Sequence, residues 1–360
     1  MKPPEILLAQ LPNLDILLTY LDSDPQAALE HALTSLNVPS RGGVVRTPIP
    51  PQLESIAAPP TGTDQVLQAG TRALNKIASQ GEAVDLEPDE AIGLEAIVQL
   101  YGRPALLVEN HVFEPAPPGW EILEEKRAAI ETNMLSVGRI EVAGHPRLSW
   151  IGTGFLVAEQ VIMTNRHVAL EFCEQTPRKH WRIRPDMLVD IDFNEEKGAG
   201  NGTDNALEYN LTGVVGIHEE YDLALLRVAA HSRSGQDLPP VLGLSAEPPS
   251  SGAGHKIYVV GYPALDSRNN LGVMQRIFNN IYNVKRLQPG EITTILDTKN
   301  WFLHDCSTLG GNSGSCVIDL ETNLVIGLHF GGAYLKENTA ISLWRLQDDP
   351  LIQKANIRYT

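Results

Sequence analysis

Ser313 lies in a glycine-rich segment whose residue types suit nucleophilic catalysis. Residues 310–315 read GGNSGS. The flanking glycines predict a tight turn that exposes the serine hydroxyl group. Such a turn also leaves the backbone N–H groups of Gly311 and Ser313 free to bind an oxyanion during acyl transfer.

A serine hydroxyl is a weak nucleophile at neutral pH, so acyl transfer needs a base nearby and an acid that orients the base. His167 follows the apolar segment 161–163 and a short polar turn, which predicts an imidazole at the end of a strand. Asp222 comes directly before the apolar run 223–226, where a strand enters the core. Together with Ser313, these residues could hydrolyse acyl groups. Such chemistry calls for neither a cofactor nor a metal.

The order His167, Asp222, Ser313, with its flanking residues, resembles the chymotrypsin-like serine peptidases. The segments that carry the resemblance are 152–157, 161–168, 221–224, 260–263 and 311–315. The resemblance spans residues 134 to about 346 and implies two six-stranded β-barrels with the active site between them. It also implies a serine endopeptidase with this triad, with the N–H groups of Gly311 and Ser313 as the oxyanion hole, and with a protein as substrate.

Asn312 departs from the digestive members of this family. Those enzymes carry an aspartate immediately before the serine, and it pairs with a newly freed α-amino group when the zymogen is cut. Asn312 is uncharged and cannot form that ion pair. We therefore expect control of the site to come from elsewhere, as in the bacterial branch of the family.

Three residues are candidates for the wall of the P1 pocket. Ser307 stands where trypsins carry the aspartate that binds basic side chains, so a basic P1 residue is disfavoured. Thr308 and His329 resemble the pair that lines the P1 pocket of bacterial glutamyl endopeptidases, and both side chains can donate to a carboxylate. We expect an acidic P1 residue, with a small or apolar P1 residue as the alternative. His304 and Arg166 are further candidate donors.

Short apolar segments separated by turn signals predict a mostly β fold. The expected strands are 137–142, 152–157, 161–164, 187–193, 223–228, 257–262, 316–320 and 324–328. They divide into a first barrel over 134–238 and a second over 254–346, within a peptidase domain over 131–360. Helical spacing predicts a C-terminal helix over 341–357.

The first third of the chain predicts a smaller, mainly helical domain. We expect a helical hairpin over 1–40, a proline-rich linker over 41–63 and an acidic, mainly helical adaptor segment over 64–130. Residues 1–130 hold 18 acidic and 8 basic residues, which is −10 of the total net charge of −16. A strand is also expected at 103–109.

Composition restricts location and partners. The net charge of −16 argues against nucleic acid as a partner, because phosphate binding draws on clustered Lys and Arg. Neither a signal peptide nor an apolar run long enough for a bilayer is evident, which predicts a cytoplasmic protein without membrane contact. The three cysteines predict buried thiols, with a Cys306–Cys316 bridge as the alternative.

The layout resembles bacterial conflict and defence peptidases, in which an adaptor segment couples the peptidase to a sensor ATPase or a pore-forming effector encoded nearby. By this analogy we expect regulation through the N-terminal module and a role in antiviral defence. Two other readings are a quality-control protease that cleaves after small or apolar residues, and a non-catalytic binding module on a protease fold. The physiological substrate, the need for a trigger and the oligomeric state are not predictable from the sequence.

Overall fold

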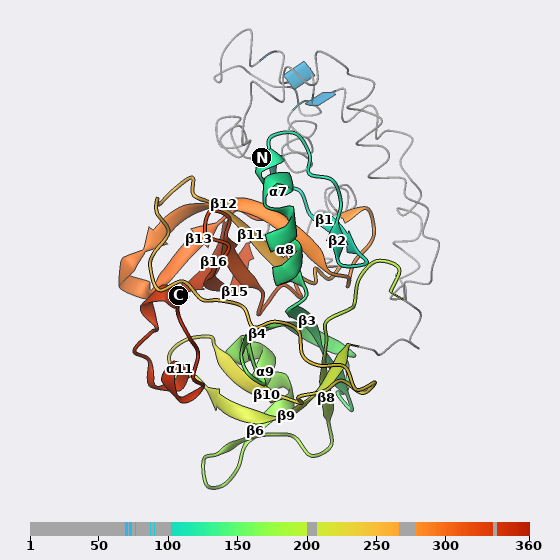
Figure 1. The fold of residues 1–360 in the computed structure, drawn as a ribbon, viewed down its shortest axis with the longest axis vertical. Coiled ribbons are helices and arrows are strands. Elements are labelled where there is room, and N and C mark those ends of the chain that lie inside the picture. Colours follow the sequence, from blue (N-terminus) through green and yellow to red (C-terminus); the bar gives the residue numbers. More distant parts are fainter. Residues whose placement is uncertain are drawn as a thin grey trace. The chain divides into compact units, whose positions relative to one another are not determined.

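The computed structural model describes residues 102–199, 207–265, 278–333 and 337–360, together with a few positions between 69 and 90. The expected hairpin over 1–40 and the expected linker over 41–63 lie outside these residues, as does most of the adaptor segment. Within the described residues, the chain is mostly β (Figure 1). The mostly β fold predicted for the peptidase domain is confirmed.

The elements have the following bounds. The strands are β1 (Leu106–Glu109), β2 (Val112–Phe113), β3 (Val137–Ala143), β4 (Trp150–Ala158), β5 (Val161–Thr164), β6 (Cys173–Gln175), β7 (Trp181–Ile183), β8 (Leu188–Asp192), β9 (Glu208–Ile217), β10 (Ala224–Val228), β11 (Lys256–Gly261), β12 (Arg286–Leu296), β13 (Trp301–His304), β14 (Cys316–Asp319), β15 (Val325–Ala333) and β16 (Glu337–Ser342). The helices are α7 (Glu121–Glu125), α8 (Arg127–Met134), α9 (Arg166–Phe172) and α11 (Pro350–Lys354), with 3-10 turns at Asp297–Lys299 and Leu343–Arg345.

The first barrel closes the strands in the order β10-β5-β4-β3-β8-β9, with β9 pairing back to β10. Strand β3 shows why the sheet closes around a core, because Ile140 and Val142 are buried while Arg139 and Glu141 between them are partly exposed. The short helix α9 follows β5, and its buried Val168, Ala169 and Phe172 join the same core. This helix carries His167.

The second barrel closes the strands in the order β11-β14-β15-β16-β13-β12, with β12 pairing back to β11. Its core contains Ile257, Val259, Val317, Ile326 and Phe302, all fully buried. Figure 1 shows these strands as a separate group from those of the first barrel. Two closed six-stranded barrels agree with the predicted fold.

The eight predicted strands of the two barrels all fall on observed strands, but four barrel strands are absent from that set. These are β9, β12, β13 and β16. They carry polar residues or backbone breakers within the strand: β12, for example, contains Pro289 and Gly290. Their strand conformation depends on pairing with neighbours, because their own residue patterns are weak.

A hairpin within the predicted adaptor segment 64–130 groups with the barrels. Leu106–Glu114 belong to the same compact unit as the two barrels, whereas Pro115–Glu125 belong to the other compact unit. The strand expected at 103–109 is β1, and it pairs with the second barrel through Leu106↔Leu287 and Leu107↔Arg286. With β2 it forms a hairpin that extends the second sheet.

A buried ionic cluster ties this hairpin to both barrels. The ammonium group of Lys285, at the start of the second barrel, donates to the carbonyl oxygens of Met134 and Phe193 at 3.0 and 2.7 Å, and to Glu196 at 3.1 Å. Glu196 also accepts from the backbone N–H of His111, at the hairpin turn, at 2.7 Å. Lys285 is fully buried, so each of these bonds replaces one that water would make.

The predicted C-terminal helix over 341–357 is too long. Residues up to Ser342 belong to β16, a 3-10 turn follows, and α11 covers only Pro350–Lys354. Pro350 at the first helical position and Asp349 as the N-cap fix where the helix begins, since the Asp349 side chain accepts from the N–H groups of Leu351 and Ile352. Of the apolar residues before it, Ile341 lies in β16, whereas Leu343 and Trp344 lie in the 3-10 turn.

The three cysteines are free and buried, so Cys306 and Cys316 are not bridged. Desolvation raises the pKa of the Cys316 and Cys173 thiols to about 12, which makes both poor nucleophiles at neutral pH. In the described part of the chain, no helix has both the length and the apolarity that a bilayer span requires.

Candidate active site

His167 and Asp222 form the hydrogen-bonded pair that the sequence predicts. The Nδ1 atom of His167 lies 2.6 Å from Oδ2 of Asp222, and the backbone N–H of His167 donates to Oδ1 at 2.9 Å. Both carboxylate oxygens are therefore occupied by one residue, which fixes the ring relative to the acid. The imidazole is half exposed, so its outer nitrogen is open to a substrate.

The elements that carry this pair meet because β5 and β10 are neighbours. Thr164, at the end of β5, pairs with Ala224 at the start of β10, so the residues after one strand lie beside those before the other. The side-chain amide of Asn165 donates to the backbone carbonyl of Asp222 at 2.9 Å, which closes the gap between the two segments.

Ser313 lies in a turn that only glycine could form at two positions. Gly311 and Gly314 both have φ of 89°, in the left-handed region. A Cβ atom on Gly314 would lie 2.1 Å from the carbonyl oxygen of Thr153, and one on Gly311 would lie 2.4 Å from that of Tyr262. The predicted tight turn is therefore present, and neighbouring backbone leaves no room for a larger residue there.

The serine turn of the second barrel bonds directly to the first barrel. The N–H of Thr153 on β4 donates to the carbonyl of Ser313 at 2.9 Å. Gly152 lies between the serine turn and helix α9. A Cβ atom there would meet the Ser313 carbonyl oxygen at 2.9 Å and a methyl group of Val168 at 3.0 Å. Val168 follows His167 on α9, so the structure brings the serine turn next to the start of that helix.

A hydrogen bond fixes the orientation of the peptide bond between Gly310 and Gly311. Its carbonyl accepts from the N–H of Ala264 at 2.6 Å, and in a trans peptide the N–H of Gly311 then points the opposite way. Among the residues that the structure describes, no acceptor bonds the N–H groups of Gly311 and Ser313. Both donors are thus available to an oxyanion.

Asn312 uses its side chain inside the turn. Its amide donates to the carbonyl of Leu309 at 3.3 Å, its Oδ1 lies 3.5 Å from the hydroxyl of Ser315, and the side chain is fully buried. Gly261 packs against it so closely that a Cβ atom there would come within 2.4 Å of Oδ1. Bonds within the segment thus hold the turn, and none of them involves a charged group.

Ser307, Thr308 and His329 lie in the second barrel and are all buried. The Thr308 hydroxyl donates to Oδ1 of Asn338 at 2.7 Å, and the Asn338 amide donates to the carbonyl of Cys306 at 2.7 Å. The amide of Gln288 donates to the carbonyl of Ser307. Neither Asn338 nor Gln288 is predictable from local sequence, because each reaches this loop from a distant strand.

Comparison with known proteins agrees with this geometry. Residues 152–328 match the family described as the trypsin-like peptidase domain. A probable serine protease of Lysobacter enzymogenes is 28% identical over 344 residues, which cover 84% of this chain and 89% of that protein. The chain is a serine protease, and its residues 152–328 are similar to the trypsin-like peptidase domain.

Two further relatives of the protease are more distant. A glutamyl endopeptidase of Staphylococcus epidermidis is 26% identical over 193 residues, which cover 53% of this chain and 57% of that protein. A crystal structure of a protease from M. tuberculosis in its active form has 19% sequence identity and a TM-score of 0.42, and the match covers 66% of this chain and 87% of that one.

His304 and Arg166, the two further donor candidates, take different places in the protease. The Nε2 atom of His304 lies 3.2 Å from Nδ1 of His329, so His304 contacts one residue of the predicted P1 wall. Arg166 donates to the backbone carbonyls of His218 and Glu219 in the first barrel. Of the two, only His304 is connected to the predicted P1 wall.

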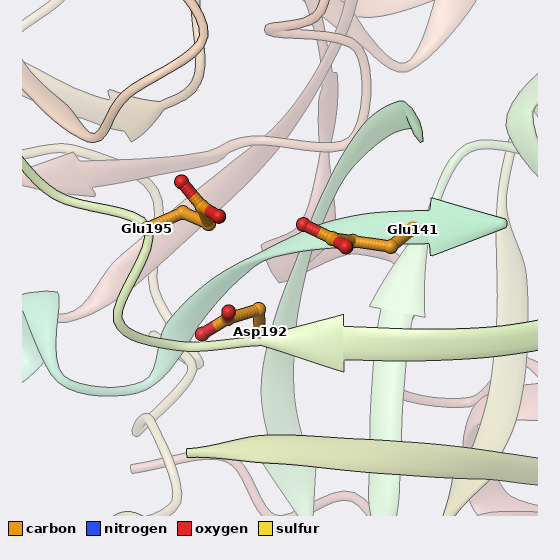
Figure 2. A group of neighbouring side chains, drawn as sticks. All are labelled: Glu141, Asp192 and Glu195. Carbon is orange, nitrogen blue, oxygen red and sulfur yellow. The ribbon is translucent and has the colours of Figure 1, made fainter. Parts of the chain in front are cut away.

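A second group of titratable residues lies on the first barrel, away from the triad. Oxygen atoms of Glu141, Asp192 and Glu195 all lie within 4.8 Å of one another (Figure 2). The guanidinium of Arg139 pairs with both Glu141 and Glu195. Burial raises the pKa of the Glu195 carboxyl group to about 7, although Arg139 opposes the shift. An arginine thus supplies positive charge to two of the three carboxylates.

Proposed function

We propose that this serine protease is an endopeptidase whose nucleophile is Ser313, whose base is His167 and whose orienting acid is Asp222. Ser313 Oγ attacks the scissile carbonyl carbon, and its proton passes to Nε2 of His167. The N–H groups of Gly311 and Ser313 bind the oxyanion. When the peptide C–N bond breaks, His167 returns the proton to the leaving amine. Water then hydrolyses the acyl-enzyme by the same route.

The observation that carries this assignment is the pair of hydrogen bonds from His167 to Asp222 beside a serine turn with two available N–H groups. A fluorophosphonate probe tests it. Wild type should be labelled at Ser313, and Ser313→Ala should not. Asp222→Asn should lower kcat about 10⁴-fold, because an amide in place of the carboxylate favours the wrong tautomer of His167. Equal labelling of wild type and Ser313→Ala would refute the assignment.

We further propose that the protease prefers an acidic P1 residue. Support comes from the wall formed by His329 and Thr308, and from the similarity to a glutamyl endopeptidase. Because the Thr308 hydroxyl proton already bonds Asn338, His329 is the donor that remains for a P1 carboxylate.

The contact with buried His304 favours the tautomer of His329 that can donate a hydrogen bond to a P1 carboxylate. Nδ1 of His304 is buried, and within the described residues it has no hydrogen-bond partner. Buried N–H groups are left unpaired less often than buried acceptors, so the proton of His304 belongs on Nε2, where it donates to Nδ1 of His329. His329 then carries its own proton on Nε2, which can donate to a ligand.

A small or apolar P1 residue is the competing specificity, and burial of the histidines is the observation that favours it. Desolvation holds the pKa of His329 well below its usual value, so the empty pocket carries no fixed positive charge. Peptides that differ only in Glu, Gln or Ala at P1 discriminate the two. Acidic preference requires Glu to exceed both others in kcat/KM, and His329→Ala should remove that advantage.

We also propose that the N-terminal residues regulate the protease, in the cytoplasm, together with a sensor ATPase or a pore-forming effector of a defence system. The similarity to the Lysobacter protein supports a shared layout, because it extends well beyond residues 152–328. Assay of the full chain alone and with the proteins encoded by adjacent genes tests this. Equal rates in both conditions would count against regulation by those proteins.

A further inference from the structure

His218 lies four residues before Asp222, in the loop between β9 and β10. We infer that His218 is a positioning residue that fixes the triad acid by tying this loop to the first turn of α11. The inference rests on the proposed role of Asp222.

Within the loop, His218 bonds to residues on both sides of Asp222. Its Nδ1 atom accepts from the N–H groups of Glu220 and Tyr221 at 3.0 and 2.9 Å. Its backbone N–H donates to the carbonyl of Leu223 at 2.9 Å. Asp222 lies between Tyr221 and Leu223, so the segment that presents its carboxylate is bonded to His218 at either end.

The second ring nitrogen of His218 reaches the C-terminal segment. Since Nδ1 is an acceptor, the neutral ring carries its proton on Nε2, which donates to Oδ2 of Asp349 at 3.0 Å. The other oxygen of Asp349 accepts from the N–H groups of Leu351 and Ile352, which caps α11. Both side chains are nearly buried, at 12% and 13% exposure, so solvent screens this pair weakly.

Helix α11 is itself anchored to the first barrel. Leu351 packs onto Gly216 of β9, where a Cβ atom would come within 2.4 Å of its methyl group. The ammonium group of Lys354 donates to the carbonyl of Val215 at 2.7 Å. The path from β9 through α11 and His218 to Asp222 is therefore continuous, and α11 gives the loop a fixed support.

The base of the triad is joined to the same loop. Arg166, which precedes His167, donates to the carbonyl of His218 at 3.2 Å. The charged or titratable groups that face His218 are thus Arg166, Tyr221 and Asp349. The Tyr221 ring lies 4.8 Å from that of His218 between centroids, tilted by 44°. A shift of His218 would move Asp222 relative to His167, whereas the predicted P1 wall lies on the second barrel. The expected defect is therefore in kcat rather than in KM.

Two variants separate the contacts of His218. His218→Asn keeps a side-chain acceptor near Glu220 and Tyr221 but cannot reach Asp349. Asp349→Asn still caps α11, but its amide group opposes the Nε2–H of His218. We expect each variant to lower kcat per titrated active site by about 10-fold to 100-fold, with KM within about twofold. The double variant should be no worse than either single variant, because both break one contact.

The pH profile distinguishes positioning from loss of fold. A displaced Asp222 carboxylate stabilises the His167 imidazolium less, so the acid limb of kcat/KM should move to lower pH in both variants. Partial unfolding would instead scale the whole profile without moving it. His231→Asn is the matched control, because His231 and Asp237 form a similar pair, at 3.0 Å, whose side chains are 63% and 89% exposed. It should behave as wild type.

Unchanged kcat per titrated site in both variants would overturn the inference, as would a loss that follows the fraction of titratable enzyme with an unmoved acid limb. Asp222→Asn separates this failure from failure of the proposed function. If Asp222→Asn is severely impaired while the His218 and Asp349 variants are not, only the positioning role of His218 is wrong. If Asp222→Asn is fully active, the triad assignment itself fails.

Discussion

Nε2 of His304 and Nδ1 of His329 lie 3.2 Å apart, with both rings buried in the second barrel. Burial lowers the pKa of His304 to about 3, and it lowers that of His329 well below the usual range, with further contributions from His304 and His167. Both imidazoles are therefore neutral in the free enzyme. The predicted P1 wall therefore carries no permanent positive charge.

Replacing His304 should weaken discrimination for acidic substrates without harming the chemistry. His304→Phe removes the partner that fixes the tautomer of His329, so we expect kcat/KM for a Glu substrate to fall about 10-fold and that for the matched Gln substrate to change less. Steady-state kinetics on the two peptides measures this. His180→Phe, at an exposed position, is the control. Equal losses on both peptides would contradict the proposed role of His304 in fixing the tautomer of His329.

Ala264 offers a test of the oxyanion hole through the backbone. Ala264→Pro removes the N–H that orients the Gly310 carbonyl, so the N–H of Gly311 is no longer held toward the substrate. We expect kcat to fall on the order of 10-fold to 100-fold with little change in KM. Ala264→Ser keeps the N–H and should retain wild-type rates. A proline variant with wild-type kcat would show that this bond does not orient the hole.

Glu195 should make stability depend on pH in a direction that can be checked. The folded state raises the pKa of its carboxyl group from 4.5 to about 7, mainly through desolvation, so the folded state holds this proton more tightly. The contribution of Glu195 to the free energy of unfolding therefore falls as the pH rises from about 4.5 to about 7. Glu195→Gln cannot ionise, and its melting temperature relative to wild type should rise by about 2–4 °C between pH 5 and pH 8.

Thermal unfolding followed by circular dichroism at both pH values measures this difference. Glu159→Gln, which removes a negative charge from an exposed turn, serves as the control. If the difference between Glu195→Gln and wild type is the same at pH 5 and pH 8, the raised pKa of Glu195 is wrong.

Lys285 should be among the most sensitive positions for stability. Lys285→Met leaves Glu196 buried without its ammonium partner and frees two buried carbonyl groups, so we expect a loss of about 3–5 kcal/mol in the free energy of unfolding. Adding Glu196→Gln removes the uncompensated charge and should restore part of that loss. Urea unfolding gives the values. Lys197→Met, at a more exposed ion pair, should cost little, and an equally mild effect of Lys285→Met would contradict the role of the cluster.

Local sequence predicts those parts of this protein whose conformation depends on residues adjacent in the chain. The apolar runs at β5 and β10, the glycines around Ser313 and the order of the triad residues all predict their structures, because burial and turn geometry are local requirements. The contacts of Thr308 with Asn338 and of His304 with His329 depend on strand register across β13, β15 and β16. No local pattern encodes that register.

The predicted length of the C-terminal helix is wrong for the same reason. The apolar spacing after Ile341 fits a helix, but pairing with β13 and β15 makes the chain a strand up to Ser342, and Pro350 delays the helix. The link from His218 to Asp349 spans more than a hundred residues, so neither residue alone indicates it.

The β1–β2 hairpin restricts how this enzyme could have changed its partners during evolution. Leu106 and Leu107 extend the edge of the second barrel at β12, and His111 meets the Lys285–Glu196 pair. A recombination event that joined a new N-terminal region directly to residue 134 would expose that sheet edge and one side of the buried ion pair. Exchange of N-terminal regions is therefore expected at junctions before residue 106, with the hairpin inherited as part of the protease.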